Sequence, residues 1–157
     1  MADIVHEQVG DVASITLNRP DSLNALTCDM MVQLRERVDE APRRGARVIL
    51  LQGRGRAFCS GADLRAASTG KMPPAEVTLG EYLNPLIEAM AASPIPIVTA
   101  LNGVAAGAGA ALAFSGDIVV AAHSAYILLP FATRAMVPDA GTTWLIVRSI
   151  GRARTLE

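Results

Sequence analysis

The chain has 157 residues, a length that fits one domain, and its 51% hydrophobic and 18% charged residues exclude disorder as its general state. Fourteen Lys and Arg against 15 Asp and Glu leave a net charge of −1, which gives no reason to expect nucleic acid or an anionic membrane as a partner. Two cysteines and two histidines are too few for a disulfide framework and leave little for a metal site, so we expect a reduced, cytoplasmic protein without bound metal.

The predicted elements alternate between short apolar runs and segments of helical period, which is typical of an α/β domain. In chain order they are strands at 3–8 and 11–18, a helix from Thr27 to about residue 41, a strand at 47–52, helical chain at 76–92, a strand at 96–101, a helix at 105–113, strands at 118–122 and 126–129, and a helix at 142–150. No linker divides the chain, so we expect one domain over 1–157.

The stretch 89–116 carries no charged residue and is longer than the ~20 residues that cross a bilayer. Pro94 and Pro96 interrupt its first half, and Asn102-Gly103 is a turn signal. Much of the remainder is Ala and Gly rather than Leu or Phe. We therefore expect a buried strand followed by a buried helix, and no membrane span.

Two loops rich in glycine and alanine share one physical design. Each follows a short apolar strand and opens a helix: 58-FCSGADL-64 follows the strand at 47–52, and 102-NGVAAGAGAAL-112 follows the strand at 96–101. The first turn of a helix has unpaired backbone N–H groups, so two such corners that meet at one point can bind an oxyanion through the backbone alone. The alternative is that the small residues serve only close helix–strand packing.

Four strings carry a resemblance to a known family: 17-LNRPDSLNAL-26, 57-AFCSGADL-64, 98-VTALNGVAAGAGAALAFSGDIVVA-121 and 137-VPDAGTTWL-145. In this order and spacing they resemble the enoyl-CoA hydratase/isomerase (crotonase) superfamily over essentially the whole chain. The resemblance implies an α/β, crotonase-like (ClpP/crotonase) fold of repeated β-β-α units. It also implies an acyl-CoA thioester substrate, whose enolate would accept hydrogen bonds from the N–H groups of Ala62 and Ala108.

The residues that contact coenzyme A are likewise implied by the resemblance. Ser60 to Leu64 would line the adenine and pantetheine, Asp21 to Leu23 would flank the nucleotide, and Arg65 would lie near the CoA phosphates. The whole implied substrate-binding set is Ser22, Leu23, Ser60, Gly61, Ala62, Asp63, Leu64, Arg65, Gly107 and Phe131. No cofactor is expected besides the coenzyme A of the substrate. We expect Asp63 to hold its loop by accepting backbone hydrogen bonds.

The resemblance also bears on the reaction. Hydratases of this family use two glutamates, and the corresponding positions here are Ala111 and Phe131, neither of which transfers a proton. Asp139 is the one carboxylate in a suitable place, and a single acid/base is sufficient to move a proton between carbons. The motifs are most similar to those of the 1,2-epoxyphenylacetyl-CoA isomerase branch. We therefore expect an isomerase with Asp139 as its acid/base.

Three alternatives remain open. The first is that Asp139 caps the helix at 142–150 instead of acting as an acid/base. The second is that the protein is a hydratase with altered acid/base residues. The third is that it is a catalytically silent acyl-CoA-binding subunit. Family chains continue into a C-terminal helical part, and that part is missing from this sequence. We therefore expect an incomplete crotonase-like core, with a homotrimer or a dimer of trimers for the full-length protein. Phe131 and Trp144 are expected to pack, Phe131 against the acyl pocket.

Overall fold

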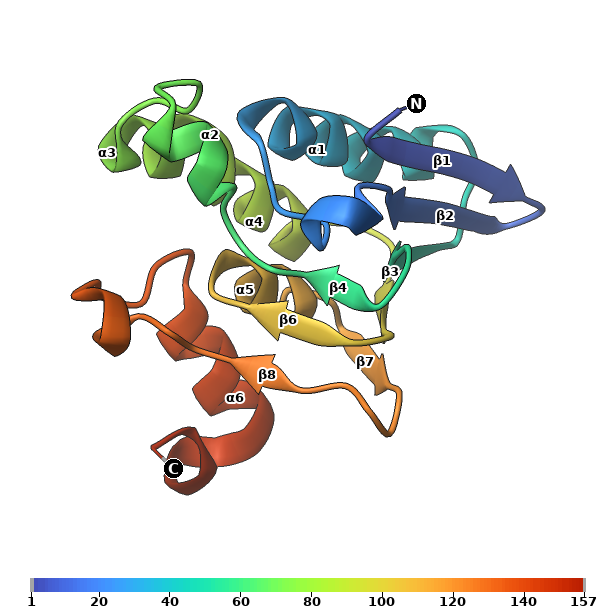
Figure 1. The fold of residues 1–157 in the computed structure, drawn as a ribbon. Helices are drawn as coiled ribbons and strands as arrows, with labels where there is room; N and C mark the ends of the chain where they lie inside the picture. The colour runs from blue at the N-terminus through green and yellow to red at the C-terminus, as the bar shows by residue number, and fades with distance from the viewer. Residues whose placement is uncertain (1, 157) are drawn as a thin grey trace.

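The chain forms two β-sheets, and from β3 onward successive strands alternate between them, as Figure 1 shows for residues 2–156, which this computed structural model describes. A five-stranded sheet has the order β1-β2-β3-β5-β7, and a three-stranded sheet has the order β4-β6-β8. The strands are β1 (Ile4–Val9), β2 (Val12–Leu17), β3 (Val48–Gly53), β4 (Ala57–Cys59), β5 (Ile97–Leu101), β6 (Val104–Ala106), β7 (Ile118–Ala121) and β8 (Ile127–Leu128). The α-helices are α1 (Cys28–Arg43), α2 (Leu64–Ser68), α3 (Ala75–Val77), α4 (Asn84–Ala91), α5 (Ala108–Phe114) and α6 (Thr142–Thr155).

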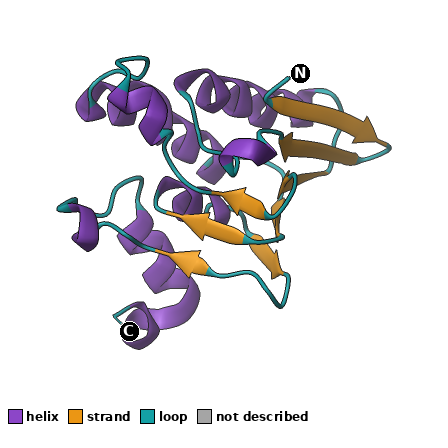
Figure 2. Ribbon diagram, in the orientation of Figure 1, coloured by secondary structure: helices purple, strands orange, loops and turns teal. Residues whose placement is uncertain are grey.

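Three consecutive β-β-α units build most of the chain (Figure 2), namely β3-β4-α2, β5-β6-α5 and β7-β8-α6. The first strand of each unit joins the five-stranded sheet and the second joins the three-stranded sheet, with parallel pairing between units. The antiparallel β1–β2 hairpin precedes them and pairs with β3 through β2. The predicted α/β fold of repeated β-β-α units is therefore confirmed.

The helix predicted to start at Thr27 is α1, and Thr27 is its N-cap residue. The Thr27 hydroxyl accepts a hydrogen bond from the Met30 N–H at 3.2 Å, which satisfies one free donor of the first turn of α1. The buried residues of α1 lie on one face, and they are Met30, Met31, Leu34, Val38 and Ala41. This apolar face packs against α4 and the first sheet. Between α3 and α4 the chain forms the π-helical turn η2 (Thr78–Leu83).

The structure differs from the predictions at the two glycine-rich loops. The first loop contains β4, and the helix predicted at 105–113 is instead β6 followed by a helix that begins at Ala108. Strands of three residues are too short to show a period of two. Gly107 has a φ of 51° and a ψ of −122°, a conformation that no α-helix contains, and it separates the two elements.

The uncharged stretch 89–116 folds as buried elements rather than as one long helix. It contains the end of α4, then β5, β6 and α5. No helix among residues 2–156 is long and apolar enough to cross a membrane.

Helix α5 contacts strands of both sheets and brings the second loop close to the first. It contacts β5 on one side and β4 and β6 on the other, and in Figure 1 it lies behind β6. Gly109 has no room for a side chain, because a Cβ there would overlap the Cys59 carbonyl of β4. The small residues of α5 therefore serve close packing, and this same packing sets the separation of the two loops.

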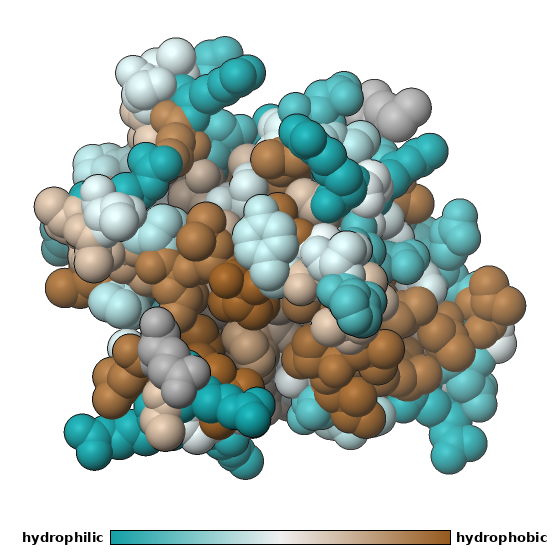
Figure 3. Space-filling view, turned by 60° about the horizontal axis from the view of Figure 1, so that its bottom comes forward, coloured by the Kyte–Doolittle hydropathy of each residue, from teal (hydrophilic) through white to brown (hydrophobic). Residues whose placement is uncertain are grey.

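Apolar side chains remain exposed on the face that carries β7, β8 and α6, where Figure 3 shows brown surface around a hollow. In the edge strand β7, Ile118 and Val120 are 54% and 60% exposed. The expectation that Trp144 packs in the interior is wrong, since its side chain is 59% exposed, with the Arg148 guanidinium 4.9 Å from its ring centre. Trp144 lines a shallow hollow together with Ile87 and Ala91 of α4 and Phe114 of α5.

Candidate active site

The two glycine-rich corners meet at one cavity of about 330 Å³. Its walls come from the loop before α1, from the β4–α2 and β6–α5 corners, and from the segment between β8 and α6, which includes the 3-10 helix η3 (Ala132–Arg134). The predicted site residues that line it are Leu23, Ser60, Gly61, Ala62, Leu64, Gly107, Ala108, Phe131 and Asp139. Four motifs that are far apart in the sequence therefore converge on a single cavity.

The first corner holds Ala62 between two backbone hydrogen bonds to one residue of another segment. The Leu26 N–H donates to the Gly61 carbonyl at 2.8 Å, and the Asp63 N–H donates to the Leu26 carbonyl at 2.9 Å. This parallel bridge leaves the intervening Ala62 N–H without a hydrogen-bond partner within residues 2–156. A free donor on a lining residue of a cavity is what an oxyanion site requires.

The second corner exposes the Ala108 N–H at the first residue of α5. The Gly107 N–H donates to the Leu128 carbonyl at 3.0 Å, and the Gly107 carbonyl accepts from Ala110 at 2.9 Å. The Ala108 N–H has no acceptor among the described residues. A Cβ built on Gly61 would lie 3.5 Å from the Ala108 nitrogen, so the two corners are in contact. Two backbone donors without acceptors therefore belong to lining residues of one cavity, on corners that touch each other.

Asp139 lies on the third wall of the same cavity, and its Oδ1 atom is buried without a hydrogen-bond partner. Burial raises the pKa of this carboxyl group, because the charged form loses hydration. The alternative that Asp139 caps α6 does not apply to its side chain. Its main-chain carbonyl, not its carboxylate, accepts from the Thr142 N–H at 2.8 Å and from the Thr142 hydroxyl. The carboxylate is therefore available to a bound molecule.

The positions where hydratases of the family place glutamates supply no acid here. Phe131 is 6% exposed and lines the cavity, and Ala111 is buried inside α5. Cys59, beside the first corner, is also buried, and desolvation raises the pKa of its thiol to about 12, so it stays protonated at neutral pH. Among residues 2–156, Asp139 is the one carboxylate that lines this cavity.

Several lining residues were not predicted from the sequence. Two of them belong to β6 and the others lie between β7 and α6: Val104, Ala106, Tyr126, Leu128, Pro130, Arg134 and Met136. Their place in the cavity depends on how β6 and the segment before α6 pack against the two corners. No local pattern carries that information, because most of these side chains are apolar and look like ordinary core or surface residues.

Three of the predicted substrate-binding residues face a different hollow. Ser22, Asp63 and Arg65 line a second depression of about 510 Å³, together with Lys71. Leu23 and Leu64, their neighbours in sequence, line the first cavity. The segments 22–23 and 62–65 therefore form a wall between the two hollows, with successive residues on opposite sides.

Comparison with known proteins agrees with the fold. A family model described as enoyl-CoA hydratase/isomerase matches residues 7–157. The chain is 44% identical over 149 residues to the 1,2-epoxyphenylacetyl-CoA isomerase of Escherichia coli K12, covering 92% of this chain and 57% of that protein. It is 43% identical over 145 residues to a probable enoyl-CoA hydratase of Rhodobacter capsulatus, covering 92% and 56%.

Solved structures show the same likeness. An enoyl-CoA hydratase from Mycobacterium avium subsp. paratuberculosis K-10 superposes with a TM-score of 0.87 at 34% identity, covering 99% of this chain and 62% of that one. The chain thus spans 56–62% of the length of these relatives. The family match extends over nearly all of the chain, and the two corners and the cavity lie within it. The chain belongs to the enoyl-CoA hydratase/isomerase family and has the crotonase fold.

Proposed function

We propose that this protein is an acyl-CoA isomerase that acts through a thioester enolate. The thioester oxygen accepts hydrogen bonds from the N–H groups of Ala62 and Ala108, and Asp139 moves the proton. One observation carries the proposal: a buried carboxylate oxygen without a partner and two free backbone donors share one cavity. Such donors stabilise negative charge as it develops on oxygen, which is a large contribution in a site with little water.

A single carboxylate, Asp139, is sufficient for the proton transfer because it removes a proton and returns it to the same substrate. For a 3-enoyl thioester, the Asp139 carboxylate takes a proton from the α carbon, and the electron pair moves onto the thioester oxygen as a dienolate. The same carboxyl group then returns the proton to the γ carbon, which leaves the 2-enoyl thioester. A pKa raised by burial makes the carboxylate a stronger base toward a carbon acid.

The second hollow supports a site for the CoA nucleotide. Arg65 and Lys71 line it, and neither makes an ion pair with a carboxylate of residues 2–156. Arginine and lysine side chains are the usual partners of phosphate groups. The wall formed by 22–23 and 62–65 would then lie beside the pantetheine.

The substrate is proposed to be 1,2-epoxyphenylacetyl-CoA or a 3-enoyl-CoA. The name of the Escherichia coli relative supports the first, and the single acid/base supports either isomerisation. Hydration is the second candidate, because the Rhodobacter capsulatus relative bears that name. Against hydration stands the absence of an acid at Ala111 and Phe131, so the part of the chain that the structure describes supplies no pair of carboxylates in the cavity to position water.

The test is to supply 3-enoyl-CoA, 2-enoyl-CoA and 1,2-epoxyphenylacetyl-CoA separately and to identify products by mass spectrometry and chromatography. We expect conversion of the 3-enoyl thioester or of the epoxide. Formation of 3-hydroxyacyl-CoA from the 2-enoyl thioester alone would overturn the isomerase assignment. Binding of all three without any conversion would favour the silent subunit.

The role of Asp139 has its own test. We expect Asp139→Asn to lower turnover by about 10²–10⁴-fold with little change in thioester binding, because the amide cannot accept the proton. Asp39→Asn is the matched control, since Asp39 is an exposed carboxylate on α1 that does not line the cavity. Normal turnover by Asp139→Asn would reject this role even if the reaction is right.

A further inference from the structure

An arginine–aspartate pair lies directly behind the Ala62 corner. Arg19 Nη1 donates to Asp63 Oδ2 at 2.9 Å, and the side chains are 24% and 10% exposed. The other carboxylate oxygen, Oδ1, accepts from the N–H groups of Arg65 at 3.1 Å and Ala66 at 3.0 Å, which caps α2. Burial opposes ionisation of Asp63, but the hydrogen bonds from Ala66 and Arg19 outweigh it and lower its pKa.

The same guanidinium also holds the opposite side of the bridge. Arg19 Nη1 donates to the Ala25 carbonyl at 2.6 Å. Ala25 precedes Leu26, whose N–H and carbonyl bond to the residues on either side of Ala62. Arg19 therefore links both segments of the bridge, one through Ala25 and the other through Asp63. The Ala62 peptide lies between these two attachments.

The loop that carries Arg19 is itself held in a costly conformation. Leu23 and Asn24 have φ values of 53° and 55°, which non-glycine residues rarely adopt. The fully buried Asn24 side chain accepts from the Arg19 N–H at 2.8 Å and donates to the Ala57 carbonyl of β4 at 2.9 Å. Strained backbone of this kind persists where the surrounding contacts over-determine it. The loop is therefore fixed to the same strand from which the Ala62 corner departs.

We propose that Arg19 is a positioning residue that orients the Ala62 N–H toward the thioester oxygen. The inference rests on the proposed function, because it concerns the same backbone donor. The direction of a backbone donor is set by the peptide plane, and a displacement of about 1 Å at a reacting group is enough to cost roughly 10²-fold in rate. Arginine suits this position because its planar guanidinium offers several donors in fixed directions, which lysine does not.

The test measures how strongly the protein polarises a bound thioester. An acyl-CoA labelled with ¹³C at the thioester carbonyl is bound to the protein, and the carbonyl stretch is recorded by isotope-edited difference infrared spectroscopy. We expect a shift to lower frequency in the wild type, and we expect Arg19→Met to lose most of it. Turnover falls about 10–100-fold. Arg19→Lys recovers part of the shift.

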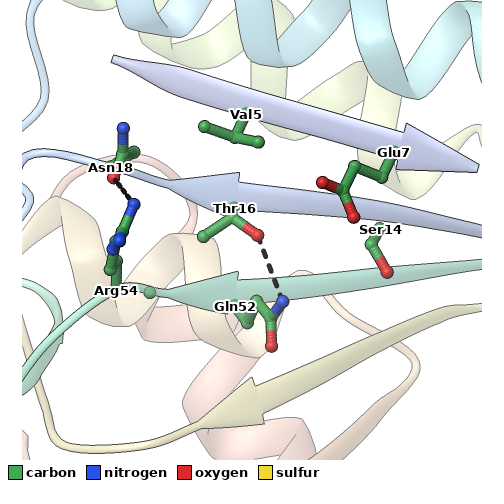
Figure 4. A pocket seen from close by; sticks show the side chains of 8 residues that line it. Val5, Glu7, Ser14, Thr16, Asn18, Gln52 and Arg54 are labelled. Atoms are coloured by element: carbon green, nitrogen blue, oxygen red, sulfur yellow. Dashed lines mark hydrogen bonds between the residues drawn. The ribbon is translucent and has the colours of Figure 1, made fainter. Parts of the chain in front are cut away.

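Arg54→Met is the matched control. Figure 4 shows Arg54 reaching Asn18 across the outer face of β2 and β3, and its Nη1 donates to Asn18 Oδ1 at 3.2 Å. The side chain lies near the same loop but makes no hydrogen bond or ion pair to residues 60–63. We expect Arg54→Met to keep the wild-type carbonyl frequency. An equal loss in both variants would mean that the loop responds to any disturbance, and would overturn the specific role of Arg19.

The outcomes separate the two proposals. If the wild type causes no carbonyl shift, the proposed backbone oxyanion site is wrong. If the wild type and Arg19→Met cause the same shift, the oxyanion site stands and the positioning role of Arg19 is wrong. If Arg19→Met does not fold, Asp63→Asn replaces it, because the amide oxygen still caps α2 while the ion pair is lost. A full wild-type shift in folded Asp63→Asn would reject the proposal equally.

Discussion

Asp139 is a residue whose position in the cavity has a cost in stability. Its folded pKa is raised above the ordinary value of 3.8 by burial, so the unfolded chain releases this proton first as pH rises. The free energy of unfolding therefore falls as pH rises from 3.8 toward the raised folded pKa, and the loss persists at neutral pH. Residues in active sites often lower the stability of the folded protein in this way.

We expect Asp139→Asn to be at least as stable as the wild type at pH 7, although turnover is lost. The neutral amide removes the penalty for burying charge, so the difference in urea midpoint shrinks as pH is lowered toward 3.8. Urea unfolding followed by circular dichroism at several pH values measures this. A clearly lower midpoint for the variant at pH 7 would show that the carboxylate contributes to stability instead.

The residues of the candidate site that a single sequence can reveal are those that lie in short motifs. Ala62, Ala108 and Asp139 lie in short motifs with fixed spacing, and the structure brings all three to one cavity. Arg19 was not found, because the carboxylate that links it to the Ala62 corner is distant in sequence: Asp63 is 44 positions away. A hydrogen bond of that separation leaves no periodic or local signal in a single sequence.

Among the elements, α5 owes its position to its glycine rather than to apolar bulk. The helix approaches β4 so closely that a side chain at Gly109 would meet the Cys59 carbonyl. We expect Gly109→Ala to destabilise the protein by about 1–3 kcal/mol, as overpacking of a core does, and to move apart the N–H groups of Ala62 and Ala108, the proposed oxyanion donors. Urea unfolding gives the first effect, and loss of thioester binding gives the second.

Gly80→Ala is the control for this substitution. A Cβ at Gly80 would meet nothing within 4 Å, and its φ is not positive. Alanine in this helical turn should therefore be neutral or stabilising by up to about 1 kcal/mol. Equal losses in the two variants would indicate that alanine is harmful for a reason other than contact with β4.

The elements that sequence reasoning missed share a physical cause. Strands β4 and β6 have three residues each, and each pairs with a strand of a neighbouring unit in the three-stranded sheet. The still shorter β8 lies inside the strand that was predicted at 126–129. The long elements α1, β1 and β2 were predicted to within a few residues, because their apolar spacing and turn signals are contained in the segments themselves.

At the scale of the whole molecule, β7 leaves an apolar edge of the five-stranded sheet exposed. Such edges pair with other chains unless a charge blocks them. We expect this 157-residue chain to self-associate with rising concentration, and Val120→Lys to reduce that association, as measured by sedimentation velocity.

Val9→Lys serves as the control for the added charge. Val9 is 76% exposed and ends β1, the strand at the other edge of the same sheet. Each substitution replaces valine with lysine and changes the net charge from −1 to 0, so the two variants differ only in which edge of the sheet carries the new charge. If both variants change association equally, net charge rather than the β7 edge governs it.

The wall between the two hollows places a strict demand on loop length. Ala62 and Leu64 face one hollow while Asp63 and Arg65 face the other. Inserting or deleting a single residue there would exchange the two pairs of side chains. Asp63 and Arg65 would then face the first cavity, and Ala62 and Leu64 would face the second hollow. Evolution of this corner is therefore freer to replace side chains than to change their number.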